Sequence, residues 1–230
     1  MSRPFFAQYR KREREIEHEF GNLPFFTQLP LLTDLQFKRY LLQRFHTSKE
    51  FIGWYNKALI CPLSVKAKAA LRRILYDEVS GDKKTHLELL VDELTSIGIP
   101  LTEILASQQT ARTTEILRRM EQLVSWDHQD QYEALKILTG LRVAGEVLVS
   151  IEYEQIISEL ERRDLLKRVD SVFYVPHQEH DSSSTGSHSD AFAQVLSEYL
   201  VEGAAVQVAV LSLEGAYSIR RDFLDQTFTF

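Results

Sequence analysis

A short stretch of the chain, residues 173–196, concentrates side chains that could do chemistry. It holds three of the seven histidines, two aspartates and a run of small polar residues. An exposed loop has no need for three imidazoles, and a core helix would not tolerate Ser-Ser-Ser-Thr-Gly. Imidazole and carboxylate groups are common ligands of divalent metal ions. We therefore expect a metal site here, with further ligands supplied from elsewhere in the chain.

Other apolar segments contain side chains that could complete such a site. Glu146 is the most informative of them, because its neighbours in VAGEVLV are apolar and an isolated carboxylate is costly to bury. Carboxylates and imidazoles from several helices are the usual ligands of di-iron and di-manganese centres in helical bundles. No dinucleotide-binding, P-loop, GxSxG or HExxH motif competes with this interpretation. The predicted ligands are Glu78, His86, Glu146, His177, Asp181 and His188.

Each predicted ligand also has an ordinary structural interpretation. Glu78 stands beside Asp77 at a predicted helix end, where carboxylates are often only solvated. His86 could merely pack near a helix N-terminus, and Asp181 could be a capping or turn residue. A metal site is favoured because the ordinary structural interpretation would require all of these residues to occur together by chance.

The apolar periodicity and the stop signals predict an all-α protein of about seven to eight helices. We find no convincing strand pair and no linker that would divide the chain, so we expect one domain over residues 1–230. Residues 1–22 form its N-terminal helix, and residues 182–187 are a small polar insertion in the site helix. The predicted helices cover residues 5–20, 34–60, 65–79, 85–97, 102–125, 127–160 as one or two helices, 173–200 and 202–225.

Charge and composition limit the classes of partner and the compartment. The net charge of −6 does not favour nucleic acid, which usually contacts a basic face. Cys61 is the single cysteine of the sequence, so an internal disulfide is excluded. Its apolar setting favours a structural role. No run of 18 apolar residues and no signal-peptide core is present, so we expect no membrane association and a cytoplasmic location.

Aromatic side chains are dense in the helix predicted over residues 34–60. They could line a ligand pocket, although aromatic residues more often serve core packing. The candidates for the pocket wall are Phe45, Phe51, Trp54 and Tyr55.

The order of the candidate ligands resembles that of the haem-oxygenase-like helical bundle superfamily, over roughly residues 25–225. This group includes TenA thiaminases, PqqC, CADD proteins and haem-oxygenase-like di-iron oxidases, and CADD-like proteins look most similar. YDEVSGDKKTHLELL resembles the segment with the first two ligands, Glu78 and His86. Glu146 looks like the middle ligand, and residues 173–181 match F-x-x-x-H-x-x-x-D.

The sequence departs from the family pattern at the last histidine. The family places it three residues after Asp181, where this chain has Ser184, and the next histidine is His188. On an unbroken helix His188 would lie about 10.5 Å along the axis from Asp181, too far to share a metal ion. Either the polar insertion bulges out and returns His188, or the site lacks that ligand, with His180 as an alternative.

The resemblance implies an O2-dependent, non-haem di-metal (di-iron) oxidase or oxygenase that acts on a small organic substrate. The implied cofactors are two iron ions, with manganese as an alternative; we assign no organic cofactor and no catalytic side chain. The alternative is a metal-free or degraded-site small-molecule-binding protein of the PqqC/TenA-like group. A purely partner-binding helical protein is a third interpretation. The expected partners are a small-molecule substrate and O2, and a homodimer is plausible because such bundles commonly pair.

Overall fold

The computed structural model describes residues 4–79, 84–126, 130–181 and 187–229, except for the side chains of residues 180, 181 and 229. These residues form helices and no strand. The α-helices are α1 (Pro4–Gly21), α2 (Pro24–Gln28), α3 (Asp34–Ile60), α4 (Val65–Val79), α5 (His86–Ser96), α6 (Leu101–Ala106), α7 (Ala111–Leu123), α8 (Glu133–Leu141), α9 (Leu148–Arg162), α10 (Tyr174–Asp181), α11 (His188–Tyr199) and α12 (Gly203–Asp225). A π-helical segment, Arg142–Val147, joins α8 to α9, and short 3₁₀ turns cover Leu29–Leu31, Arg168–Asp170 and Gln226–Thr229.

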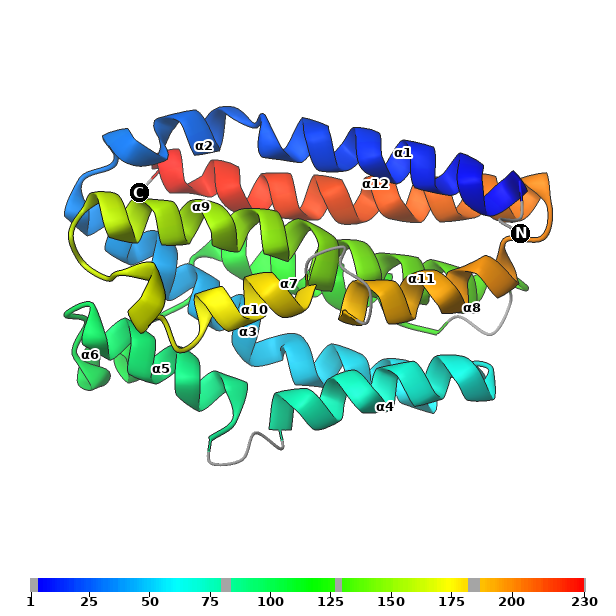
Figure 1. Cartoon of the computed structure of the whole chain (residues 1–230), viewed down its shortest axis with the longest axis horizontal. Helices are drawn as coiled ribbons and strands as arrows, with labels where there is room; N and C mark the ends of the chain where they lie inside the picture. Colours follow the sequence, from blue (N-terminus) through cyan, green and yellow to red (C-terminus); the bar gives the residue numbers. More distant parts are fainter. Residues whose placement is uncertain (1–3, 80–83, 127–129, 182–186, 230) are drawn as a thin grey trace.

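The helices pack as an elongated bundle around a large apolar core (Figure 1). The first and last long helices, α1 and α12, run side by side along one edge, and α9 lies next to α1. Helices α4 and α5 lie along the opposite edge, with α3 packed against both, while α10 packs on α9 and α11 packs on α4. The C-terminus of α4 and the N-terminus of α5 therefore lie close together, opposite α10 and α11.

Helix caps encoded in the sequence fix the starts of two helices that lead to the site. Thr33 and Gln36 form a reciprocal capping box at the start of α3, and Thr85 and Glu88 form another at the start of α5. Such caps satisfy backbone N–H groups that have no partner within the helix. At its other end α5 stops at Ser96, and Gly98, two residues later, has a φ of 90° that favours glycine. The helix predicted over residues 85–97 is thus confirmed, and its first residue is His86.

Among the helices predicted before residue 173, two are wrong in their extent. Residues 102–125 do not form one helix, because Thr110 accepts a hydrogen bond from the Thr113 amide and starts α7 anew. The Gln43 side chain holds the break by bonding the Gln108 carbonyl and the Thr110 amide, both at 2.9 Å. The helix predicted from residue 127 begins only at Glu133 and is interrupted by the π-helical segment. Residues 23–32, which connect α1 to α3, are largely helical.

Candidate metal centre

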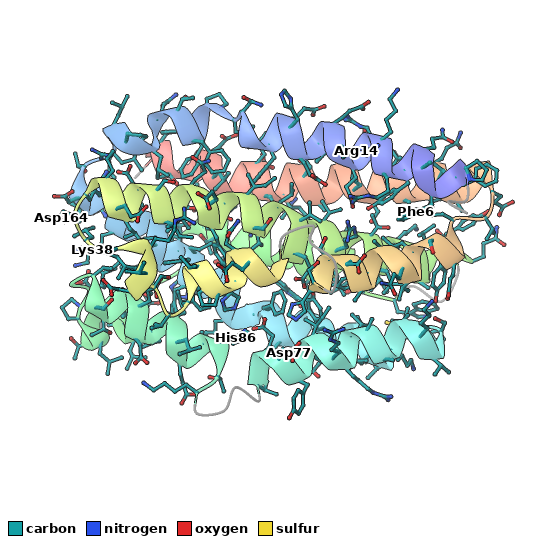
Figure 2. All side chains as sticks on the ribbon, viewed as in Figure 1. Phe6, Arg14, Lys38, Asp77, His86 and Asp164 are labelled. Carbon is teal, nitrogen blue, oxygen red and sulfur yellow. The ribbon has the colours of Figure 1, made fainter. Side chains whose placement is uncertain are left out.

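Three helix ends bring Glu78, His86 and His177 together. Glu78 lies in the last turn of α4, His86 is the first residue of α5, and His177 lies in the first half of α10. His86 Nδ1 is 3.0 Å from Glu78 Oε1 and 2.9 Å from His177 Nε2. One ligand atom from each of the three lies within 4.8 Å of the others. Figure 2 shows His86 beside the end of α4 that carries Asp77.

The hydrogen bonding of His177 prepares its ring for metal binding. Its Nδ1 atom lies 2.7 Å from the Phe173 carbonyl oxygen, which can only accept a hydrogen bond. A neutral His177 therefore carries its proton on Nδ1 and has the free lone pair on Nε2, which points to the cluster. A backbone carbonyl on the far ring nitrogen is the usual orienting partner of a metal-binding histidine.

The three donor atoms fit a single transition-metal ion. Two ligand atoms bound at about 2.1 Å lie about 3 Å apart when their bonds meet at a right angle. The separations at His86 Nδ1 match this value, and His177 Nε2 lies 4.0 Å from Glu78 Oε1. Two imidazole nitrogens with one carboxylate oxygen are a donor set suited to iron, manganese or zinc. These three residues could therefore hold one ion.

A second group of ligand types, Glu146 and His188, adjoins the first. His188 Nδ1 lies 3.5 Å from Glu146 Oε2, and His188 Nε2 lies 3.0 Å from Asp77 Oδ2. Glu146 is 1% exposed, and the Tyr55 hydroxyl donates a hydrogen bond to its Oε1. Asp77 and Glu78 are consecutive in α4, so one helix end serves both groups. Asp77 was not among the ligands predicted from the sequence.

His188 reaches Glu146 because the helix predicted over residues 173–200 is interrupted. The structure has two helices there, α10 and α11, and His188 opens the second. Ser187 caps α11 by accepting a hydrogen bond from the Asp190 amide at 3.0 Å. Asp181 is the last residue of α10 and His180 precedes it, but their side chains lie outside the described residues, as do residues 182–186 of the insertion.

A buried arginine that the sequence analysis did not single out holds the first turn of α11. Arg142 donates to both carboxylate oxygens of Glu13, at 2.7 and 3.0 Å, and to the Ser189 hydroxyl at 2.9 Å. It opens the π-helical segment that carries Glu146. Burial lowers the pKa of Arg142, and the nearby Tyr9 and acidic groups oppose that shift. Arg142 thereby ties Glu146 and His188, through their neighbours, to α1.

Glu93 of α5 is a second residue that the sequence analysis missed. Its buried carboxylate accepts hydrogen bonds from the Ser171 hydroxyl at 2.6 Å and from the Phe173 and Tyr174 amides at 2.8 and 3.2 Å. These amides belong to the N-terminal end of α10, where backbone N–H groups lack intrahelical partners and favour negative charge. Glu93 therefore fastens α10, which carries His177, to α5, which carries His86. Its place on the face with Leu90 and Leu94 could have indicated a buried carboxylate.

A small cavity lies beside Glu78, His86 and His177. Of the predicted aromatic wall, Phe51 and Trp54 line it, whereas Tyr55 is not among the lining residues and instead donates a hydrogen bond to Glu146. Phe45 lines a separate surface depression with His46 instead. Arg44, Arg220 and Tyr153, which the sequence analysis did not assign to the site, also line the cavity. Cys61 lines another depression, beside Pro62 and Trp126.

The fold is that of haem-oxygenase-like proteins. The structure resembles a haem-oxygenase-like domain of unknown function from Shewanella denitrificans OS217, with a TM-score of 0.75 at 14% identity over 97% of this chain and 91% of that one. A CADD-like protein of unknown function from Nostoc punctiforme PCC 73102 has a TM-score of 0.75 at 14% identity, over 97% of this chain and 98% of that one. A TenA homologue from Pseudomonas syringae pv. tomato str. DC3000 has a TM-score of 0.75 at 11% identity, over 99% of this chain and 93% of that one.

The sequence itself identifies the family. A family model described as iron-containing redox enzyme matches residues 38–215, and the chain belongs to this family. No curated protein matches the chain by sequence. The all-α fold and the haem-oxygenase-like family predicted from the sequence are thus confirmed. None of the helices in the described ranges combines the length and the apolar character that a membrane crossing requires.

Proposed function

We propose that the protein is an O2-dependent, non-haem di-iron oxidase or oxygenase that acts on a small organic substrate. The observation that carries the proposal is the convergence of His86 Nδ1, His177 Nε2 and Glu78 Oε1 beside a cavity. Membership of an iron-containing redox family supports iron as the metal. Carboxylate and imidazole ligands from separate helices are typical of such centres in helical bundles.

The chain offers ligands for two ions. Glu78, His86 and His177 would hold one, and Glu146 and His188 would hold the second, with Asp181 as the further ligand predicted from the sequence. When bound, the two ferrous ions would supply the electrons with which O2 is reduced. The carboxylates would offset the charge of the two cations, which would otherwise be costly to bury in an apolar interior.

The residues around these ligands have separate tasks in the proposed enzyme. Tyr55 orients Glu146 through its hydrogen bond, and the Phe173 carbonyl orients His177. The rings of Phe51, Trp54 and Phe173 line the cavity with apolar surface and limit the entry of water. A substrate in the cavity would therefore meet the metal ligands in a largely dry setting.

A metal-free small-molecule-binding protein is the second candidate, and one observation favours it. The Nδ1 atom of His86 lies within hydrogen-bonding distance of both His177 Nε2 and Glu78 Oε1, so one proton on it can be shared between them and the cluster is compatible with a folded protein without an ion. Cys61 lies outside the cavity, which argues against a TenA-type enzyme that uses this cysteine as its nucleophile. Metal content separates the two candidates.

The test is anaerobic loading with ferrous iron, removal of excess metal and measurement of bound iron. We expect about two irons per chain in the wild type. Substituting a ligand in either group, by His86→Ala or Glu146→Ala, should lower the bound iron, whereas the exposed His18→Ala should retain it. An iron-free wild type would refute the oxidase and leave the metal-free candidate. Full iron content in both ligand variants would refute the assignment of the ligands.

A further inference from the structure

Two buried arginines share the cavity with the candidate metal ligands. Arg44 of α3 is 4% exposed and Arg220 of α12 is 6% exposed, and both line the cavity. The other charged or titratable groups among its described lining residues are Lys49, Glu78, His86, Tyr153 and His177. An arginine is almost never this buried unless it is paired, so the partners of the two guanidinium groups decide what this part of the cavity can bind.

The described residues supply one carboxylate for the two guanidinium groups. Glu152 lies 3.5 Å from Arg44 Nε and is also paired with Arg220 Nη2. The remaining polar contacts of Arg44 are neutral hydroxyls, including Ser48 Oγ at 3.1 Å and Tyr153 Oη at 2.9 Å. The Nε atom of Arg220 is buried and has no hydrogen-bond partner in the described part of the chain. Two positive charges therefore face a single negative one.

This imbalance makes the cavity favourable for an anion. Burial and the neighbouring Arg44 lower the pKa of Arg220, which is the direction expected for a cation with too little compensating charge. A buried charge without a partner costs several kcal/mol, and a small anion in the cavity would remove that cost. The guanidinium group also matches a carboxylate in geometry, since it can donate two parallel N–H bonds.

The arginines lie within one aromatic residue of the candidate metal centre. The Tyr153 hydroxyl accepts the hydrogen bond from Arg44, and the Tyr153 ring centroid is 6.0 Å from that of His177. A small molecule held at the guanidinium groups would therefore place its other end beside Glu78, His86 and His177.

We infer that the cavity binds a small organic carboxylate, with the carboxylate on Arg44 and Arg220 and the organic part directed toward the metal ligands. That this carboxylate is the substrate rests on the proposed function. A monoanion is favoured because it matches the single uncompensated positive charge, whereas a phosphate dianion would leave the site over-compensated.

The test uses metal-free, full-length protein, so that iron cannot contribute to binding. Calorimetric titration at about pH 8, where free imidazole is neutral, compares hexanoate with hexan-1-ol and hexylamine, which have the same chain and a different head group. We expect hexanoate to bind at least about tenfold more tightly than either, the effect of one charge-assisted hydrogen bond or more. Equal binding of the alcohol, or tighter binding of inorganic phosphate, would overturn the proposal. This comparison needs no variant to fold.

Variants then locate the binding group. Arg220→Gln should weaken hexanoate binding at least about tenfold, while Lys49→Gln, which alters an exposed cation at the same cavity, should change it by less than about threefold. Circular dichroism verifies that each variant is folded. Unchanged hexanoate affinity in a folded Arg220→Gln protein would overturn the proposal. If the protein binds hexanoate but takes up no iron, the anion site is supported and the oxidase is refuted. If it takes up iron but does not bind hexanoate, the anion site is refuted and the oxidase is supported.

Discussion

The Nε2 atom of His177 lies 2.9 Å from the Nδ1 atom of His86, although 91 residues separate them in the chain. His177 is also held at its other ring nitrogen by the Phe173 carbonyl, and the same Nδ1 atom of His86 lies 3.0 Å from Glu78 Oε1. The contact joins the first turn of α5 to the middle of α10. The residues that hold these two helices together therefore control the geometry of the candidate centre.

Glu93 is the first residue by which this dependence can be tested. Glu93→Gln removes a buried charge that accepts several hydrogen bonds at the start of α10, and we expect it to lower the free energy of unfolding by about 1.5–3 kcal/mol. Hydrogen exchange should quicken at the amides of Phe173 to His177. The matched control is Glu198→Gln, an exposed partner of Lys66, which should cost less than about 1 kcal/mol. Unchanged exchange in α10 would show that Glu93 does not hold this helix.

Gly145 allows the close approach of α3 to the segment that carries Glu146. A Cβ atom at Gly145 would lie 3.1 Å from Tyr55 Oη and 3.3 Å from Phe51 Cε2, whereas one at Gly215 meets nothing within 4 Å. Gly215→Ala, inside α12, should raise the free energy of unfolding by about 0.5–1 kcal/mol. Gly145→Ala should gain less or lose stability, because Tyr55 must shift. If chemical denaturation showed that Gly145→Ala stabilises the protein as much as Gly215→Ala does, the tight contact of Gly145 with Tyr55 and Phe51 would be contradicted.

Cys61 should be nearly inert toward thiol reagents in the native protein. Burial raises the pKa of its thiol, and nearby Glu133 adds to the shift, so little reactive thiolate is present at neutral pH. We expect slow labelling by a disulfide reagent in buffer and rapid labelling in concentrated urea. Rapid stoichiometric labelling of the folded protein would reopen a nucleophilic role for this residue.

Acid should remove a stabilising contribution from Glu159. Burial opposes ionisation, but hydrogen bonds from Arg162 and Arg163 outweigh it and lower the pKa of Glu159 in the folded state. A lowered folded-state pKa stabilises the protein above the unfolded value of about 4.3, and that stability is lost as the pH falls through the folded value. The free energy of unfolding of the wild type should therefore exceed that of Glu159→Gln by about 1 kcal/mol at pH 7.

The same difference should shrink as the pH falls below about 4. Urea denaturation at the two pH values provides the measurement. Glu15→Gln, an exposed partner of Arg12, is the control and should change stability by less than about 1 kcal/mol at either pH. A constant difference between wild type and Glu159→Gln would contradict the lowered pKa.

Local signals in the sequence predicted the features that depend on neighbouring residues. The helix starts predicted at residues 34 and 85 agree with α3 and α5, which begin directly after Thr33 and Thr85. The apolar setting of Glu146 indicated a carboxylate with buried partners. The polar insertion predicted an interruption after Asp181, and the structure places His188 beside Glu146. Whether His188, Asp181 and the other candidates bind metal stays a prediction.

Features that depend on distant residues could not be read from local patterns. The break between α6 and α7 is held by Gln43, more than 60 residues away. Likewise, Glu93 meets the start of α10 across 80 residues, and the pairing of Arg44 with Arg220 through Glu152 joins three helices. The π-helical segment also breaks the 3.6-residue period on which the helix prediction relies. Only the packed fold determines these contacts.

The most direct test of the central claim is anomalous X-ray diffraction from crystals of the protein loaded anaerobically with ferrous iron. The proposal predicts two iron peaks, one among His86 Nδ1, His177 Nε2 and Glu78, and the other at Glu146 and His188. A single peak at Glu78, His86 and His177 would contradict the di-iron centre, and the absence of any peak at these residues would contradict the metal site itself.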